Sequence, residues 1–254
     1  MTKFKILFTC CFCFFAVNTS IAQSLDLGRG ELPLTIPSTY SENTATPLII
    51  LLHGFGSSGA RQDAYMGFSR LAERYGFIFI APDGTPSSAN QSRFWNATPA
   101  CCDFSNTNVD DVSYVLNIIN EIKSDYNVDS NRVYLIGHSN GGFMSYQAAY
   151  EHSDIIAALV SLAGASHIDE RDAPDNPVHV LQIHGSADST ISYEGGQNLN
   201  NPYPGALESV SQWASYNGCV FEGDEREIRD LDSGIPGHES AVLLFAQSCR
   251  AGGS

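Results

Sequence analysis

The chain has 254 residues, a length that suits one α/β domain better than two. Its 28 acidic residues outnumber its 13 basic ones, which gives a formal net charge of −15. Such a charge repels phosphate backbones, so nucleic acid is a poor partner, and a strongly acidic surface aids solubility.

The first 22 residues have the order of parts found in a secretory signal peptide. Lys3 and Lys5 form a short basic start, an apolar run covers 6–17, and small residues lead to a cleavage site after Ala22. An apolar run of about 12 residues is too short to span a membrane, which needs roughly 20. We therefore expect an exported protein, extracellular or periplasmic, with no membrane partner and one folded domain over 23–254.

Five short apolar runs rich in Val, Ile and Leu predict strands buried on both faces of a parallel sheet. They cover residues 47–52, 77–81, 133–136, 156–162 and 178–183. Helical patterns lie between them at 60–75, at 110–124 with Asp110 as the N-cap, and at 205–216. This alternation predicts a doubly wound α/β sheet, in which an active site lies at the carboxyl ends of the strands.

The connection 84–108 differs from the other loops in length and composition. It is rich in Ser, Asn, Thr and Pro, but it also carries Phe94, Trp95 and the pair Cys101-Cys102. Loops this long inside a compact domain are usually functional or disordered. The aromatic residues and cysteines favour an ordered, functional loop.

A Gly-x-Ser-x-Gly motif occupies residues 137–141, with Ser139 at its centre. The motif alone is common, but here a buried strand runs into it and a helical stretch runs out of it. That order is typical of a nucleophile elbow, in which glycines permit the tight turn that exposes the hydroxyl. We predict that Ser139 is a nucleophile; the alternative is an idle serine in a glycine-rich turn.

Attack by a serine on an acyl group needs backbone donors for the oxyanion that forms. One should be the N–H of Asn140, the residue after the nucleophile, and the other should lie in the loop after an early strand. The segment 53–56 follows the strand 47–52, so we expect the second donor to be the N–H of Phe55. His53 precedes Ser139 in the chain, and we expect it to brace this loop.

An orienting carboxylate is predicted after the strand 178–183. In this fold the chain order is Ser, then Asp or Glu, then His, and Asp188 stands at the expected place. Its role would be to hold the imidazole of the base and to stabilise its charged form. The alternative is an Asp that only makes a turn. We expect His184 to be a packed residue at the strand end.

The base of such a triad must follow Asp188, and His238 is the one histidine that does. The residues before it are acidic and glycine-rich, and the next strand-like run, 241–246, comes after it. We therefore expect the base to lie beyond residue 254, with the last strand and helix of the sheet, and the chain as given to be nearly inactive. The alternative is that His238 bends back into the site.

Four cysteines remain after the predicted cleavage: Cys101, Cys102, Cys219 and Cys249. An even number in an exported protein suggests disulfides, and the spacing does not suggest zinc. We predict a Cys219–Cys249 bridge, which leaves Cys101 and Cys102 paired to each other or free. The competing arrangement links one of these two to Cys219 or Cys249.

Taken together, these residues resemble the polyhydroxybutyrate depolymerase-like esterases of the α/β-hydrolase fold, a group that includes feruloyl and acetylxylan esterases. The resemblance rests on LLHGFGSSG, GFIFIAPDG, FWNATPACCDF, VDDVSYVLNII, VDSNRVYLIGHSNGGFMSYQAA and IHGSAD. It implies an esterase with Ser139 as nucleophile and Asp188 as acid, without metal or cofactor. It also implies that 95–102 forms part of the wall near the active site, with Trp95 as a substrate contact. The sequence lacks the Gly-Gly-x-His segment that carries the base in this group.

The leading hypothesis is a secreted serine carboxylic ester hydrolase that acts through an acyl-enzyme. Its substrate would be a feruloyl or acetyl ester on plant polysaccharide, or a hydroxyalkanoate ester. Two alternatives stay open at this point: a serine peptidase, because the same triad cleaves amides, and a non-catalytic binding module on a hydrolase scaffold.

Overall fold

The structure is a computed structural model, and it describes residues 23–220, 226–251 and 253–254. The predicted signal peptide, 1–22, therefore lies outside the described residues. Within the described ranges, no helix is both long enough and apolar enough to cross a membrane.

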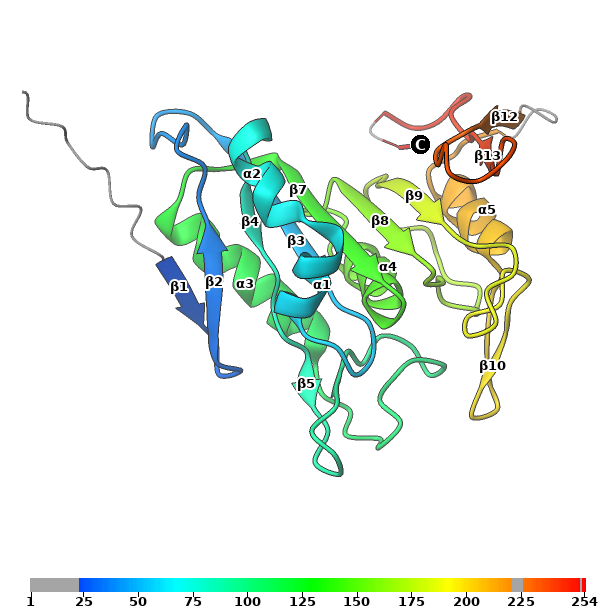
Figure 1. Ribbon diagram of the computed structural model, residues 1–254, viewed down its shortest axis with the longest axis horizontal. Coiled ribbons are helices and arrows are strands. Elements are labelled where there is room, and N and C mark those ends of the chain that lie inside the picture. The colour runs from blue at the N-terminus through cyan, green and yellow to red at the C-terminus, as the bar shows by residue number, and fades with distance from the viewer. Residues whose placement is uncertain (1–22, 221–225, 252) are drawn as a thin grey trace, which may run out of the picture.

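A seven-stranded sheet forms the centre of the described chain, in the order β1-β2-β4-β3-β7-β8-β9 (Figure 1). In this order the strands span Gln23–Asp26, Glu31–Thr35, Ile78–Ile80, Thr46–Leu52, Val128–His138, Ala158–Leu162 and His179–Ile183. Within this sheet, β4, β3, β7, β8 and β9 are parallel to one another, and β1 and β2 add an antiparallel edge. The five predicted strands are confirmed as the parallel part of the sheet.

Each face of the sheet has its own apolar core, which explains why the strands are continuously apolar. On β3, Leu48, Ile50 and Leu52 belong to one core, whereas Leu51 belongs to the other. A strand that is covered on both faces has no solvent side on which polar residues would be favoured. The continuous apolar sequences that predicted the strands therefore follow from the burial of both faces of the sheet.

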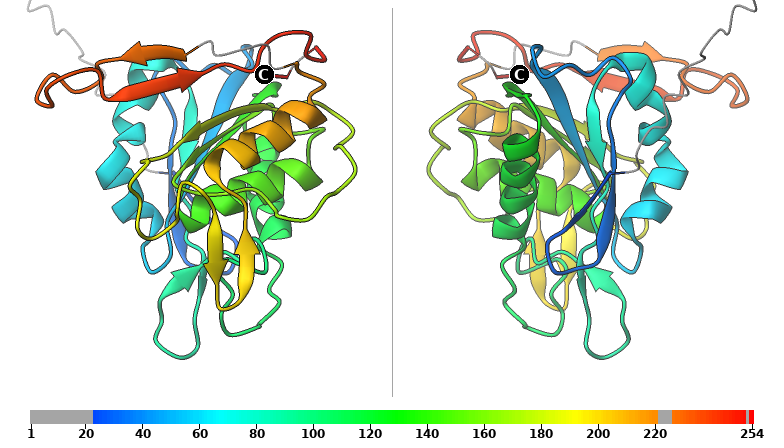
Figure 2. Two further views of the ribbon diagram at one scale, coloured as in Figure 1. Left: turned by 90° about the vertical axis from the view of Figure 1, so that its right-hand side faces the viewer. Right: turned by 90° about the vertical axis from the view of Figure 1, so that its left-hand side faces the viewer.

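Helices cover both faces (Figures 1 and 2), as predicted for a doubly wound sheet. One face carries α1 and α2; the other carries α3, α4 and α5. Their bounds are Gly59–Met66, Phe68–Tyr75, Asp111–Asp125, Asn140–Glu151 and Ala206–Tyr216. Asp110 caps α3 as predicted, because its carboxylate accepts the Ser113 N–H. The helical pattern over 60–75 is confirmed but divided into two helices, because Gly67 adopts φ 76° and ends α1 before α2 begins.

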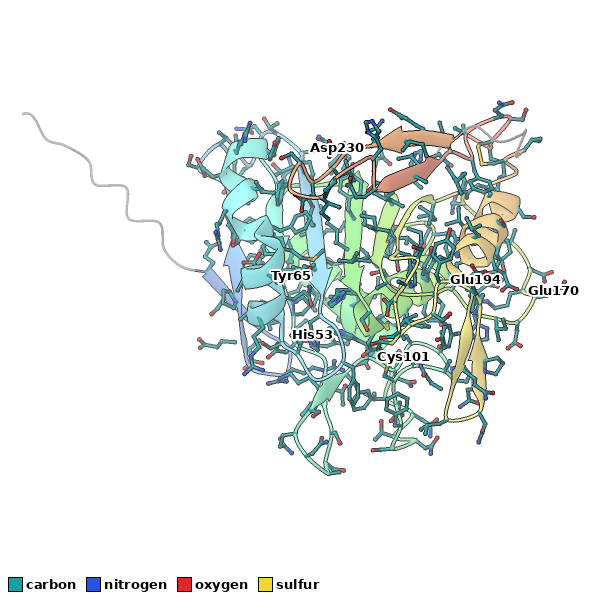
Figure 3. The ribbon with its side chains drawn as sticks, turned by 45° about the vertical axis from the view of Figure 1, so that its right-hand side comes forward. His53, Tyr65, Cys101, Glu170, Glu194 and Asp230 are labelled. Carbon is teal, nitrogen blue, oxygen red and sulfur yellow. A yellow bond between two sulfur atoms is a disulfide. The ribbon has the colours of Figure 1, made fainter. Side chains whose placement is uncertain are left out.

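Two groups of loops lie at opposite ends of the parallel strands. The short pairs β5–β6 and β10–β11 lie at the carboxyl ends, and β12 pairs with β13 at the other end (Figures 1 and 3). Their bounds are Thr85–Pro86, Arg93–Phe94, Gly196–Asn198, Asn201–Tyr203, Arg226–Arg229 and Ser240–Leu243. The predicted strand 241–246 is therefore β13, and it pairs outside the central sheet. At the edge of that sheet, the N–H of Val180 donates to the carbonyl of Ser254.

Both disulfides that the cysteine pattern allowed are formed. Cys219 bonds Cys249, which closes a loop of 30 residues and ties the C-terminal segment to the end of α5. Cys101 bonds Cys102 within the long connection. The competing arrangement between the two pairs is wrong. In the chain-entropy model, a loop of about this size stabilises the fold by roughly 3 kcal/mol.

Candidate active site

Ser139 forms a one-residue turn between a strand and a helix. β7 ends at His138 and α4 begins at Asn140. The backbone of Ser139 has φ 53° and ψ −119°, a region that residues with a side chain rarely adopt and that is found at functional sites. The turn is held in place because the Ser139 N–H donates to the carbonyl of Leu162 on β8, at 2.8 Å. The predicted strand–turn–helix is therefore present.

The two glycines of the motif are required by close packing of the backbone. A Cβ on Gly137 would lie 2.0 Å from the carbonyl oxygen of Gly141, and one on Gly141 would lie 2.1 Å from that of Leu52. The start of α4 is thus pressed against β7 and against the end of β3. This packing brings the loop after β3 to Ser139, since a Cβ on Gly54 would lie 3.4 Å from the Cβ of Ser139.

The two predicted oxyanion donors lie on either side of this contact. The N–H of Asn140 is the first of α4, where helix geometry leaves N–H groups without an intrahelical acceptor. The N–H of Phe55 has no hydrogen-bond partner among the described residues. The next residue is anchored, because the Gly56 N–H donates to the Arg93 carbonyl at 2.8 Å. The Phe55 ring is half exposed and lies 5.4 Å from the ring of Phe104.

His53 braces this loop, as predicted. Its Nδ1–H donates to the carbonyl of Gly54 at 2.7 Å, and its Nε2 accepts the Gly84 N–H at 2.9 Å. Both ring nitrogens are therefore occupied within the protein. Burial lowers the pKa of His53, so the ring is held neutral and linked to backbone on both sides.

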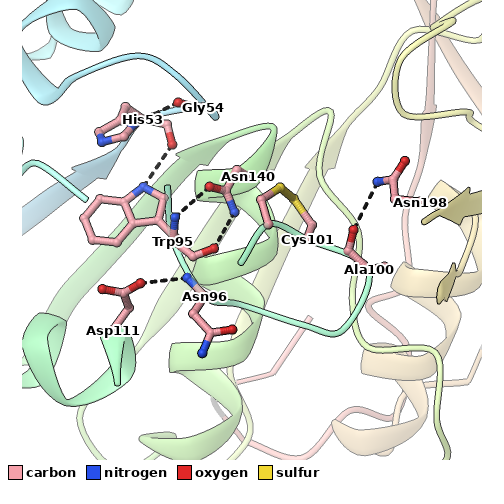
Figure 4. Close-up of a disulfide and its surroundings, with 10 residues drawn as sticks. His53, Gly54, Trp95, Asn96, Ala100, Cys101, Asp111, Asn140 and Asn198 are labelled. Carbon is pink, nitrogen blue, oxygen red and sulfur yellow. Dashed lines mark hydrogen bonds between the residues drawn. A yellow bond between two sulfur atoms is a disulfide. The ribbon is translucent and has the colours of Figure 1, made fainter. Parts of the chain in front are cut away.

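Trp95 joins the nucleophile elbow to the loop after β3 (Figure 4). Its N–H donates to Oδ1 of Asn140 at 2.7 Å, and its carbonyl accepts from Nδ2 of the same side chain at 2.9 Å. Its indole Nε1–H donates to the carbonyl of His53 at 3.0 Å. The side chain has no exposed surface. The expectation that Trp95 contacts a substrate is therefore corrected, because a side chain enclosed by protein cannot form part of a binding surface.

Asp111 anchors the long connection 84–108, a role that the sequence did not reveal. Its fully buried carboxylate accepts the Asn96 N–H at 2.7 Å and the Thr85 hydroxyl at 2.9 Å, and it forms an ion pair with Arg29 at 2.6 Å. It thereby fixes the residue after Trp95 to the start of α3. The sequence does contain an Asp-Asp pair at 110–111, but only Asp110 was given a role there, as the N-cap of the helix.

Asp188 lies after β9, at the same end of the sheet as Ser139. Its Oδ1 accepts the N–H groups of Thr190 and Ile191 at 2.8 and 3.1 Å, which is the turn geometry considered as an alternative. These bonds leave Oδ2 facing Nε2 of His184 at 3.8 Å. Burial lowers the pKa of His138, the residue before Ser139, and the negative charge of Asp188 opposes that shift. The carboxylate therefore lies close enough for its charge to affect His138.

Among the described residues, no histidine forms a hydrogen bond with the Ser139 hydroxyl. His184 is a packed residue at the strand end, as predicted, and its Nε2 donates to the Ile191 carbonyl at 2.7 Å. His238 lies in the loop between β12 and β13, which begins at Asp230 and is at the opposite end of the sheet (Figure 3). The alternative in which His238 bends back to the site is therefore wrong. A base from beyond residue 254 stays a prediction.

A comparison with protein families identifies the chain. The model of the phospholipase/carboxylesterase family matches residues 39–237, which include the elbow, the loop after β3 and Asp188. The chain belongs to this family.

Among curated proteins, feruloyl esterase B of Piromyces equi is 32% identical over 195 residues, which cover 73% of this chain and 35% of that protein. The bifunctional acetylxylan esterase/xylanase of Neocallimastix patriciarum is 28% identical over 182 residues, which cover 72% of this chain and 25% of that protein. The chain thus spans about a third and a quarter of the length of these two relatives.

Among solved structures, the acetyl xylan esterase from Aspergillus awamori matches with a TM-score of 0.55 and 18% sequence identity. The match covers 82% of this chain and 84% of that one. At this identity the similarity concerns the fold alone. Together with the family match, it confirms the α/β-hydrolase fold that the sequence predicted.

Proposed function

We propose that the protein is a serine carboxylic ester hydrolase with Ser139 as its nucleophile. The observation that carries the proposal is the backbone of Ser139 at φ 53°, held between β7 and α4 with the loop after β3 against it. A backbone conformation that costs energy is typical of functional sites, and the Ser139 side chain is partly accessible there. Membership of a carboxylesterase family supports the same chemistry.

In the proposed reaction, Oγ of Ser139 attacks the ester carbonyl and its proton passes to an imidazole base. The N–H groups of Asn140 and Phe55 donate to the oxyanion of the tetrahedral intermediate. Collapse of the intermediate breaks the C–O bond, and the base returns its proton to the leaving alcohol. Water then attacks the acyl-enzyme by the same steps and releases the acid.

We assign Asp188 the orienting role towards this imidazole. Its Oδ1 is held by two backbone N–H groups, so the carboxylate has a fixed orientation and Oδ2 is left for a further partner. The imidazole itself would come from outside the described residues. No metal or cofactor takes part in these steps.

The proposed substrates are feruloyl or acetyl esters on plant polysaccharide, with hydroxyalkanoate esters as the further class that the sequence resemblance implies. The names of the two curated relatives support the first class. Export, to the cell exterior or the periplasm, is part of the proposal. Two disulfides support it, because such bonds persist in oxidising compartments.

The test is hydrolysis of p-nitrophenyl acetate and butyrate by the full-length gene product. Ser139→Ala should lower turnover by several powers of ten, as the loss of a triad member usually does. A matched control is Ser145→Ala, because Ser145 lies further along α4 and its hydroxyl only donates to the Gly141 carbonyl. Unchanged turnover in Ser139→Ala would contradict the proposal.

Two further assays separate the alternatives. A fluorophosphonate probe should label Ser139, and a protein that stays unlabelled would be a non-catalytic scaffold. Matched ester and amide substrates should give rapid hydrolysis of the ester only. Faster cleavage of the amide would indicate a peptidase.

A further inference from the structure

The two proposed oxyanion donors belong to segments that lie far apart in the sequence. Asn140 starts α4, whereas Phe55 lies in the loop after β3. In residues 93–102, which we name the clamp loop, Trp95 forms hydrogen bonds with both segments (Figure 4). The same loop also contacts the second segment through the carbonyl of Arg93, which accepts from the Gly56 N–H. The distance between the two donors therefore depends on the position of this loop and of Trp95 within it.

We propose that Trp95 is a positioning residue that sets the spacing of the two oxyanion donors, together with the side-chain amide of Asn140. This inference rests on the proposed function. In this role the buried Trp95 affects the rate of the chemical step indirectly. It does so by positioning the N–H groups of Asn140 and Phe55, and it donates no hydrogen bond to the substrate itself.

The bonds on the elbow side determine an orientation as well as a distance. The amide of Asn140 bonds both the N–H and the carbonyl of Trp95, at 2.7 and 2.9 Å. A pair of bonds between one planar amide and one backbone segment prevents rotation of the side chain. Because the same residue supplies the oxyanion N–H, the pair ties that N–H to the clamp loop.

The bond on the other side acts on the peptide that leads to Phe55. The indole Nε1–H of Trp95 donates to the His53 carbonyl, which belongs to the peptide between His53 and Gly54. His53, Trp95 and Asn140 all have no exposed surface. In such a dry environment a lost partner leaves a buried polar group unsatisfied, so the arrangement resists distortion.

The clamp loop is itself anchored, so that Trp95 is a fixed point. Asn96 is bonded to the buried carboxylate of Asp111, and the carbonyl of Ala100 accepts from Nδ2 of Asn198 at 3.1 Å (Figure 4). The N–H of Cys102 donates to the carbonyl of Trp95 at 3.1 Å, beside the Cys101–Cys102 bridge. These contacts come from α3, from the β10–β11 pair and from the loop itself.

The inference has a specific kinetic consequence. The donors act on charge that develops in the transition state, so a shift in their spacing lowers kcat and leaves ground-state binding nearly unchanged. Displacements of about 1 Å can cost about 10²-fold in rate. A residue that contacts the substrate would instead change KM, and a residue that only supports the fold would change stability alone.

The test variant is Trp95→Phe, which keeps an aromatic ring and removes the indole N–H. We expect kcat for p-nitrophenyl butyrate to fall by about ten- to a hundredfold, with KM within about threefold. The matched control is Trp213→Phe. Trp213 is also fully buried and also donates one indole hydrogen bond at 3.0 Å, to the hydroxyl of Ser166. It should lose stability in the same way and keep kcat within about twofold.

Asn140→Ala provides an independent variant, because it removes the amide that bonds the N–H and the carbonyl of Trp95 and keeps the backbone N–H that donates to the oxyanion. It should also lower kcat at constant KM, and the double variant should lose less than the product of the two single losses. If Trp95→Phe does not fold, the kcat of Asn140→Ala carries the test. All rates are compared at one temperature, well below the lowest Tm of the set.

The outcomes are distinct from those of the proposed function. If Ser139→Ala is inactive while Trp95→Phe matches Trp213→Phe in kcat, the positioning role is wrong and the esterase proposal stands. A rise in KM at constant kcat would also overturn it, in favour of a substrate contact. If Ser139→Ala stays active, the proposed function fails first and the positioning role fails with it.

Discussion

The clamp loop and the C-terminal hairpin (residues 226–243) both lie outside the central sheet, yet they differ in burial and in bonding to the rest of the fold. In the clamp loop, residues such as Phe94, Trp95 and Cys101 are buried, and backbone groups are bonded to distant elements. In the hairpin, Ile228 is 51% and Leu231 71% exposed. The comparison shows that whether such a segment is buried depends more on its hydrogen bonds to distant elements than on its local composition.

The largest expected effect separates the two segments by stability. Asp111→Ala should lower the free energy of unfolding by about 3–5 kcal/mol, because it leaves Arg29 and the Asn96 N–H without their buried partner. Asp232→Ala in the hairpin should change it by less than about 0.5 kcal/mol, since Asp232 is exposed. Urea unfolding of both variants gives the comparison, and equal losses would remove the distinction.

The next effect tests whether the two ends of the sheet are independent. The double variant Cys219→Ser, Cys249→Ser should lose about 3 kcal/mol of stability in the chain-entropy model. Esterase activity at low temperature should stay within about twofold, because this bridge lies at the end of the sheet away from Ser139. Calorimetry and kinetics on one sample measure both quantities. A large loss of kcat in the folded variant would show that the ends are coupled.

A smaller effect concerns pH and the brace at His53. Burial lowers the pKa of His53 from its ordinary value of 6.5, so the neutral ring contributes stability that is present above pH 6.5 and is lost as pH falls. His138 and His167 have pKa values lowered in the same direction. Stability should therefore decline from pH 7 towards pH 5, and less steeply in His53→Gln. Parallel curves for the two proteins would contradict the role of His53.

The smallest expected effect is that of His238→Ala in the hairpin. Activity should stay within about twofold, and stability should change by less than about 0.5 kcal/mol, because the hairpin lies away from the carboxyl ends of the strands. Kinetics with p-nitrophenyl acetate measure the first quantity. Loss of activity in a folded variant would mean that His238 reaches Ser139, contrary to the structure.

The parts of the fold that local physics determines were predictable from the sequence. The parallel strands are apolar on both faces, and the turn at Ser139 needs glycines at fixed spacing, so each leaves a pattern in the residues. The break at Gly67 was missed, because a glycine inside a helical pattern is often tolerated. The antiparallel strands β1 and β2 were missed too, because they are short and partly exposed.

The role of Trp95 could not be predicted from its own neighbourhood. Its partners are the carbonyl of His53 and the amide of Asn140, 42 and 45 residues away in the chain. A polar loop that contains an aromatic residue is compatible with a substrate contact or with burial, and only the tertiary structure decides between them. The same holds for Asp111, whose ion-pair partner, Arg29, lies in the turn between β1 and β2.

The backbone of Ser139 places stability and activity in opposition at one position. A residue with a side chain at φ 53° and ψ −119° costs about 1–3 kcal/mol, and glycine would remove most of that cost. Under selection for folding alone, mutation would therefore carry this position towards glycine. On the proposed function, selection for the nucleophilic hydroxyl retains the serine, and its replacement by glycine in a descendant would mark the loss of that activity.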